Sequence, residues 1–194
     1  MSSYTHYIFG YGSLAHTGQL RTFLHRAEWH PGDWFFCRLH GYRRAWNVAM
    51  DNRVLRPGYK YYVDRATGER PAAYVTFMNV YPMAGASIGG VLFGVTPTEL
   101  ALLDRREANY QRISLDAGAV EQPVSGRLWL YVGLPAAEER FKAGLHDGTA
   151  VINRPYYETI MAGFQAHGAA ALADFLATTD PPQVPLHDLA RRAP

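Results

Sequence analysis

The sequence predicts an α+β domain in which a mixed sheet closes into a small barrel with flanking helices. Three observations predict this fold class. Apolar and aromatic runs of strand length dominate the first two thirds of the chain, and helical periodicity increases after them. In addition, 48% of the 194 residues are hydrophobic, which is enough for one core. We expect one domain over residues 1–179 and a proline-containing C-terminal tail over residues 180–194.

The first half of the chain indicates strands joined by turns. An apolar run at 7–9 predicts a strand that enters a glycine-rich turn, and a short helix is expected near 19–26. Turn-like segments are expected at 64–71 and 82–87. Strands are expected beside these turns, at 59–63, 72–81 and 88–95. A further strand is expected at 33–49, with a possible break near Gly41.

The clearest helix signal begins at Thr96. Thr96 can act as the N-cap, Pro97 suits the first helical position, and Glu99 stands where a capping-box acid belongs. We expect this helix to continue through Glu107. Further strands are expected at 112–115 and 127–132, and further helices after Pro135, at 155–167 and at 169–177.

Composition argues against several classes of function. Net charge is +2 and the basic residues are scattered, so we expect no nucleic-acid partner. No apolar run approaches the roughly 20 residues that span a bilayer, so we expect no membrane association. Cys37 is the single cysteine and lies in an aromatic run, where a small buried side chain is expected. None of the eight histidines stands at metal-ligand spacing, so no metal site is expected. The sequence thus predicts a cytoplasmic protein, monomeric or homodimeric.

A carboxylate falls on the buried face of the helix that starts at Thr96. At about 100° per residue, Glu107 lies close to Leu103 and Leu100 around the helix axis. A carboxylate that faces inward is costly unless it is paired or neutral. Glu107 is therefore a candidate general base.

Two alternatives remain open for this helix. Its end could fall after Arg106, so that Glu107 reaches solvent or pairs with Arg112. Asp104 is the rival carboxylate on another side of the helix, and we expect it to cap or bridge to nearby backbone.

The glycine turn at 10–15 admits three chemical interpretations. It matches the dinucleotide fingerprint G-x-G-x-x-A, but the chain after it does not alternate strands with long helices. Ser13 is not a nucleophile elbow, because Ala15 stands where that turn needs glycine. The third interpretation is an anion cradle, in which backbone N–H groups and the Ser13 hydroxyl are the donors. An ordinary turn is the remaining alternative.

Two short motifs resemble a known superfamily. Tyr11-Gly12-Ser13-Leu14, after an apolar strand, looks like the signature turn of the γ-glutamylcyclotransferase superfamily. The run Leu103-Asp104-Arg105-Arg106-Glu107, followed by Tyr110 and Arg112, is similar to the second signature, whose glutamate is catalytic. Gly41-Tyr42-Arg43-Arg44-Ala45-Trp46 also resembles the ChaC-like branch, which acts on glutathione.

The resemblance implies an enzyme that needs no cofactor and converts a γ-glutamyl amine, amino acid or peptide to 5-oxoproline and the free amine. Glu107 would exchange protons with the two amines. The substrate-binding candidates are Tyr11, Gly12, Ser13, Leu14, Tyr110, Arg112 and Tyr131, where Tyr131 has a buried structural tyrosine as its alternative. Arg43 and Arg44 are expected to be ion-paired or to meet a substrate carboxylate.

Three other functions stay open at this point. The first is an enzyme that uses the same chemistry to remove a γ-glutamyl protecting group from a biosynthetic intermediate. A non-catalytic module that binds a γ-glutamyl metabolite would keep the fold without the reaction. A nicotinamide enzyme built on the glycine turn would be retained on a nucleotide affinity column, and we expect no such retention.

Overall fold

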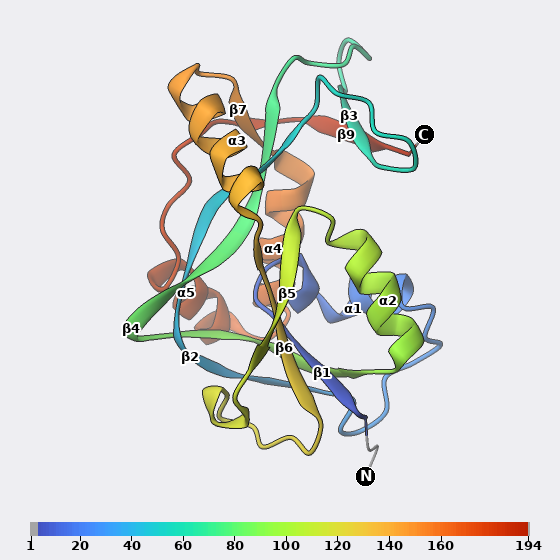
Figure 1. Ribbon diagram of the computed structural model, residues 1–194, viewed down its shortest axis with the longest axis vertical. Helices are drawn as coiled ribbons and strands as arrows, with labels where there is room; N and C mark the ends of the chain where they lie inside the picture. The colour runs from blue at the N-terminus through green and yellow to red at the C-terminus, as the bar shows by residue number, and fades with distance from the viewer. Residues whose placement is uncertain (1–3, 194) are drawn as a thin grey trace.

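The structure is a computed structural model that describes residues 4–193, and it has the predicted α+β class (Figure 1). Along the chain the elements are β1 (His6–Gly10), the 3₁₀ helix η1 (Ser13–Ala15), α1 (Thr17–Phe23), β2 (Trp34–Asp51), β3 (Tyr61–Asp64), β4 (Tyr74–Val95), α2 (Pro97–Arg106), β5 (Tyr110–Leu115), the 3₁₀ helix η2 (Ala117–Ala119), β6 (Arg127–Gly133), α3 (Pro135–His146), β7 (Ala150–Asn153), α4 (Arg154–Gln165), α5 (Ala169–Ala177), β8 (Leu186–His187) and β9 (Leu189–Arg192).

The main sheet is mixed, as predicted, and β1 lies in its middle. β1 pairs in parallel with β6 and antiparallel with β4, in the order β5–β6–β1–β4–β7–β8, and β2 also pairs with β4. An isolated bridge joins Leu39 of β2 to Val120, and the Glu121 N–H donates to Arg38 O at 3.1 Å. The sheet therefore curls until the segment that follows β5, at one edge, contacts β2 at another edge. Within residues 4–193 the paired strands do not form a closed ring, so full barrel closure stays a prediction.

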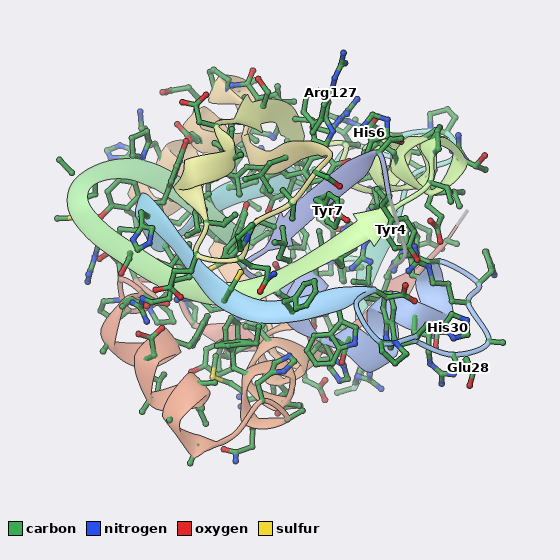
Figure 2. All side chains as sticks on the ribbon, turned by 90° about the horizontal axis from the view of Figure 1, so that it is seen from below. Tyr4, His6, Tyr7, Glu28, His30 and Arg127 are labelled. Carbon is green, nitrogen blue, oxygen red and sulfur yellow. The ribbon has the colours of Figure 1, made fainter. Side chains whose placement is uncertain are left out.

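The turn expected at 82–87 is wrong. β4 continues through this segment because β2 pairs with it antiparallel on both sides, Tyr42 with Pro82 and His40 with Ser87, whereas residues 83–86 between these pairs have no partner in β2. The pair bends instead of ending: Gly41 adopts a φ of 79°, and the register shifts between His40 and Tyr42, opposite Pro82. Pro82 cannot donate a backbone hydrogen bond, so it fits where the ladder is irregular. Figure 2 shows from below how the two long strands curve together.

Two helix boundaries differ from the expected ones. α1 begins at Thr17 because the His16 ring caps it by accepting from Gln19 N, and the left-handed His25 (φ 57°) follows its end. The predicted capping box at Thr96 is confirmed, with both of its hydrogen bonds to Glu99. α2 ends at Arg106, however, and Glu107 is its C-cap.

Residues 186–192 do not form a separate tail. β8 pairs in parallel with β7, and β9 pairs antiparallel with β3. Leu189 of β9 is 1% exposed, and Asp180 accepts hydrogen bonds from Arg43 and Tyr81. The segment is therefore built into the domain, and Figure 1 shows β9 beside β3, apart from the main sheet.

The interior has two hydrophobic clusters. The larger one lies under the main sheet and is covered by α4 and α5, and the smaller one lies beneath the β3–β9 pair. Cys37 belongs to the larger cluster, where burial raises the pKa of its thiol to about 11, in agreement with a small buried side chain. Tyr110 and Tyr156 pack against both clusters. No helix in the described part of the chain is both long and apolar enough to span a bilayer.

Candidate active site

A cleft of about 520 Å³ opens where the two hydrophobic clusters meet. Its walls are the end of α2, the β3–β9 pair with the loop before it, and the start of α4. A small inner cavity of about 30 Å³ adjoins the cleft, because both are lined by Ser13, Glu107, Tyr110 and Tyr156. The inner cavity also receives Tyr11, Gly12, Leu14 and Tyr131. Seven of the eight predicted site residues are thus brought together, and the eighth, Arg112, is not.

The glycine turn folds back tightly at the end of β1. A Cβ on residue 10 would lie only 2.8 Å from Leu14 Cβ and 2.9 Å from the Leu14 carbonyl, so this position needs glycine. The backbone bonds of η1 run from Ala15 N–H to Gly12 O and from His16 N–H to Ser13 O. The first N–H groups of a helix have no partner inside it. The N–H groups of Ser13 and Leu14, two residues that line the inner cavity, therefore have no partner within η1.

Helix α4 supports this turn along its length. Near its start, the Tyr156 hydroxyl would lie 3.8 Å from a Cβ placed on Gly12. Further along, Gly163 lets the helix approach His16, where a Cβ would lie 2.9 Å from His16 Cβ. Just beyond its end, His167 Nε2 hydrogen-bonds to Ala15 O at 3.0 Å. The position of the turn is therefore set by a separate element of the fold.

Glu107 faces the cleft even though α2 ends before it. As C-cap, it donates its N–H to Leu103 O at 2.9 Å, and its side chain is 15% exposed. Arg106 Nε lies 3.2 Å from Glu107 Oε1, and Arg106 Nη2 donates to Ser13 Oγ at 3.3 Å. Arg106 thus ties the carboxylate to the glycine turn. The Glu107 carboxylate is not within ion-pair distance of Arg112.

Asp104 and Arg112 form a separate polar group outside the cleft. Asp104 Oδ1 accepts from Tyr131 Oη at 2.7 Å and from Arg112 Nε at 3.0 Å. It therefore bridges two side chains, whereas a bridge to nearby backbone was expected. The Arg112 guanidinium also stacks on Trp129, 4.3 Å from the ring centroid. Neither residue lines either cavity. Arg112 follows Tyr110 by two residues in β5, so both lie on one face of the strand, but Arg112 lies further along it, between Asp104 and the Trp129 ring.

Three of the four tyrosines that line the inner cavity have hydroxyls hydrogen-bonded to backbone. Tyr11 Oη donates to Tyr131 O at 2.8 Å, and Tyr110 Oη donates to Met78 O at 2.6 Å. Tyr156 Oη accepts from Met78 N–H at 3.4 Å. Burial raises the pKa of Tyr11, Tyr110 and Tyr156 above the ordinary phenol value, so these hydroxyls stay protonated.

Sequence reasoning assigned none of the four cationic residues of the cleft to the site, and two of them, Lys60 and Arg191, lie outside the motifs. The Lys60 ammonium lies 4.4 Å from the centroid of the Phe77 ring, and burial lowers the pKa of Lys60 to about 8. Arg191 enters from β9. A lysine inside the aromatic run 59–62 was a usable signal, whereas Arg191 lay in a segment interpreted as a tail.

Arg43 and Arg44 do not reach the cleft. Arg43 Nε pairs with Asp180 at 2.7 Å, in line with the ion-pair alternative. Arg44 is fully buried between the rings of Phe164 and Phe175, where it bonds to Thr178 and Thr179 hydroxyls and to a backbone carbonyl. Neither residue is placed to contact a ligand in the cleft.

Within residues 4–193, no three His, Cys, Asp or Glu side chains are grouped so that they could hold a metal ion. No protein-family model matches the sequence, and no curated protein matches it.

Solved structures that this chain resembles include two γ-glutamyl cyclotransferases. One is 14% identical with a TM-score of 0.49, covering 91% of this chain and 89% of that one. The other is a yeast enzyme described as specific to glutathione, 15% identical with a TM-score of 0.44, with the same coverage of 91% and 89%. An uncharacterized human protein is 14% identical with a TM-score of 0.48, again covering 91% and 89%. These likenesses are distant, so the function has to follow from the chemistry of the cleft.

Proposed function

We propose that this protein is a γ-glutamyl cyclotransferase that converts a γ-glutamyl amine, amino acid or peptide to 5-oxoproline and the free amine. One observation carries the proposal. Glu107 is the only carboxylate among the residues that line the cleft and the inner cavity, and the inner cavity also contains the start of η1. A proton acceptor and a set of N–H donors therefore face one small space.

The reaction uses these two groups in sequence. Glu107 takes a proton from the α-ammonium of the substrate, and the freed nitrogen attacks the γ-carbonyl carbon to close a five-membered ring. The N–H groups of Ser13 and Leu14 stabilise the negative charge that develops on the carbonyl oxygen. The C–N bond to the leaving amine then breaks as Glu107 returns the proton to that nitrogen. The ring nitrogen, which still carries two hydrogens after its attack, loses one of them through Glu107 to the released amine, which leaves as an ammonium ion. No water is consumed, and the atoms of the substrate are divided between two products.

The neighbouring side chains favour Glu107 over Asp104 as the base. Asp104 already accepts two hydrogen bonds, from Tyr131 and Arg112. Glu107 has one close partner, Arg106, which also contacts Ser13. Because the ring closes within one molecule, holding the γ-glutamyl arm in a folded conformation contributes much of the rate. The end of the cleft next to Glu107, lined by Ser13, Tyr110 and Tyr156, suits that task.

The test is the release of 5-oxoproline from a panel of γ-glutamyl amides by the unaltered protein and two variants. Glu107→Gln keeps the shape but removes the base, and Asp104→Asn is the matched control on the same helix. Loss of a general base predicts a fall in kcat of about 10²–10⁴-fold for Glu107→Gln. We expect Asp104→Asn to retain most of its activity, and both variants to keep the near-ultraviolet circular dichroism of the unaltered protein.

Equal release by the unaltered protein and Glu107→Gln would contradict the assignment of the base. A protein that binds the amides but releases no 5-oxoproline would instead be the non-catalytic binding module.

A further inference from the structure

The cleft carries an excess of positive charge. Its lining contains four cationic side chains, Lys60, Arg105, Arg106 and Arg191, against the single carboxylate of Glu107. Of these cations, Arg106 is engaged by Glu107 and Ser13 next to the inner cavity. The remaining excess lies in the outer cleft, because none of the four cations lines the inner cavity.

The pairing of β3 with β9 places two of these cations, Lys60 and Arg191, on the same wall of the cleft. Tyr62 of β3 stands directly opposite Arg191 of β9, so their side chains lie on one face of the pair. Lys60 precedes Tyr62 by two residues in extended chain and therefore shares that face. All three residues line the cleft, and Arg192, the next residue of β9, does not.

Lys60 and Arg191 have no ion-pair partner in the described chain. Lys60 is partly buried against the Phe77 and Tyr59 rings, and Glu107 acts on it only from beyond ion-pair distance. A cation that is partly removed from water without a hydrogen-bonding anion is costly. A negatively charged ligand group between Lys60 and Arg191 would offset this cost.

We propose that Lys60 and Arg191 form a subsite for an anionic group, a carboxylate or a phosphate, on the leaving amine. This inference rests on the proposed function, because it assumes that the γ-glutamyl arm lies at the Glu107 end of the cleft, against the inner cavity, and the leaving amine in the outer part of the cleft. The subsite selects amides whose amine carries a negative charge and disfavours those whose amine carries a second positive charge.

The test compares four γ-glutamyl amides that differ in the charge of the amine. γ-Glutamylglycine carries a carboxylate, γ-glutamyl-aminoethyl phosphate a phosphate, γ-glutamyl-methylamide no charge, and γ-glutamyl-diaminobutane a cation. For each amide, kcat/KM is measured with the unaltered protein, Lys60→Met, Arg191→Gln and the control Arg192→Gln. The ratio of kcat/KM between anionic and neutral amides is the readout, because any effect on Glu107 itself cancels in it.

We expect the unaltered protein to prefer one or both anionic amides over the neutral one. We expect Lys60→Met and Arg191→Gln each to lower this preference about tenfold, which corresponds to ~1.4 kcal/mol. Arg192→Gln should keep the preference of the unaltered protein. The anionic amide with the larger kcat/KM shows whether the subsite takes a carboxylate or a phosphate. An unchanged preference in both cleft variants, or a preference for the cationic amide, would overturn the inference.

A binding measurement tests this inference independently of the proposed reaction. Calorimetry measures the affinity of the same amides for Glu107→Gln, alone and combined with Lys60→Met. If no amide is turned over but anionic amides bind more tightly and lose that advantage in the double variant, the reaction is refuted and the subsite stands. Equal affinities for anionic and neutral amides would refute the subsite.

Discussion

Met78 shows how single residues connect the fold to the candidate site. The register between β2 and β4 shifts between Ala45 and Val48, opposite this part of β4. There the Met78 carbonyl accepts from the Tyr110 hydroxyl, and the Met78 N–H donates to the Tyr156 hydroxyl. Two tyrosines of the inner cavity thus replace strand partners that the irregular ladder does not supply. The same side chains stabilise the strand and shape the cavity.

Removing the Tyr110 hydroxyl tests this role. Tyr110→Phe leaves the Met78 carbonyl buried without its donor, so we expect the free energy of unfolding to fall by about 1–3 kcal/mol. Urea denaturation measures the change. Tyr61→Phe is the matched control, because within residues 4–193 the Tyr61 hydroxyl has no hydrogen-bond partner. Equal stability losses in the two variants would show that the hydrogen bond to Met78 contributes nothing particular.

At the scale of elements, the sequence predicted those whose signal is local. The helix from Thr96 and its capping box follow from four neighbouring residues, and they are confirmed. Six of the seven predicted residues at the inner cavity come from motifs recognised by resemblance, the seventh, Tyr131, comes from its place in an apolar strand, and the structure groups all seven. Elements set by distant partners were not predictable in this way. β4 continues through a turn-like segment because β2 lies beside it, and β9 exists because β3 offers an unpaired edge.

The missed strand β9 has a stability consequence. Leu189 is 1% exposed and fills the smaller hydrophobic cluster beneath β3. We expect Leu189→Ala to lower the free energy of unfolding by about 2–5 kcal/mol, the usual range for a buried leucine. Leu176→Ala is the control, since Leu176 is 56% exposed and substitutions at such sites usually change stability by less than about 0.5 kcal/mol. Chemical denaturation that gives both variants the same stability would contradict the packing of β9 into the domain.

At the scale of the whole molecule, the cleft lies where two hydrophobic clusters share tyrosines. Tyr110 and Tyr156 pack against both clusters, and β2 and β4 run through both. The turn after β1, the end of α2 and the start of α4 are distant in sequence but meet there. Composition and local periodicity contain no information about such a meeting point. This is why Arg191 was found only in the folded chain, and why the lysine inside the aromatic run 59–62 could not be connected to the site from the sequence alone.

We propose that the substrate's own amine, deprotonated by Glu107, breaks the γ-glutamyl bond. The most direct measurement is mass spectrometry of the product formed from a γ-glutamyl amide in water labelled with ¹⁸O. Cyclisation consumes no water, so we expect unlabelled 5-oxoproline in an amount equal to the released amine, and release that is slower by about 10²–10⁴-fold with Glu107→Gln. Glutamate carrying ¹⁸O would show hydrolysis by water and contradict the account.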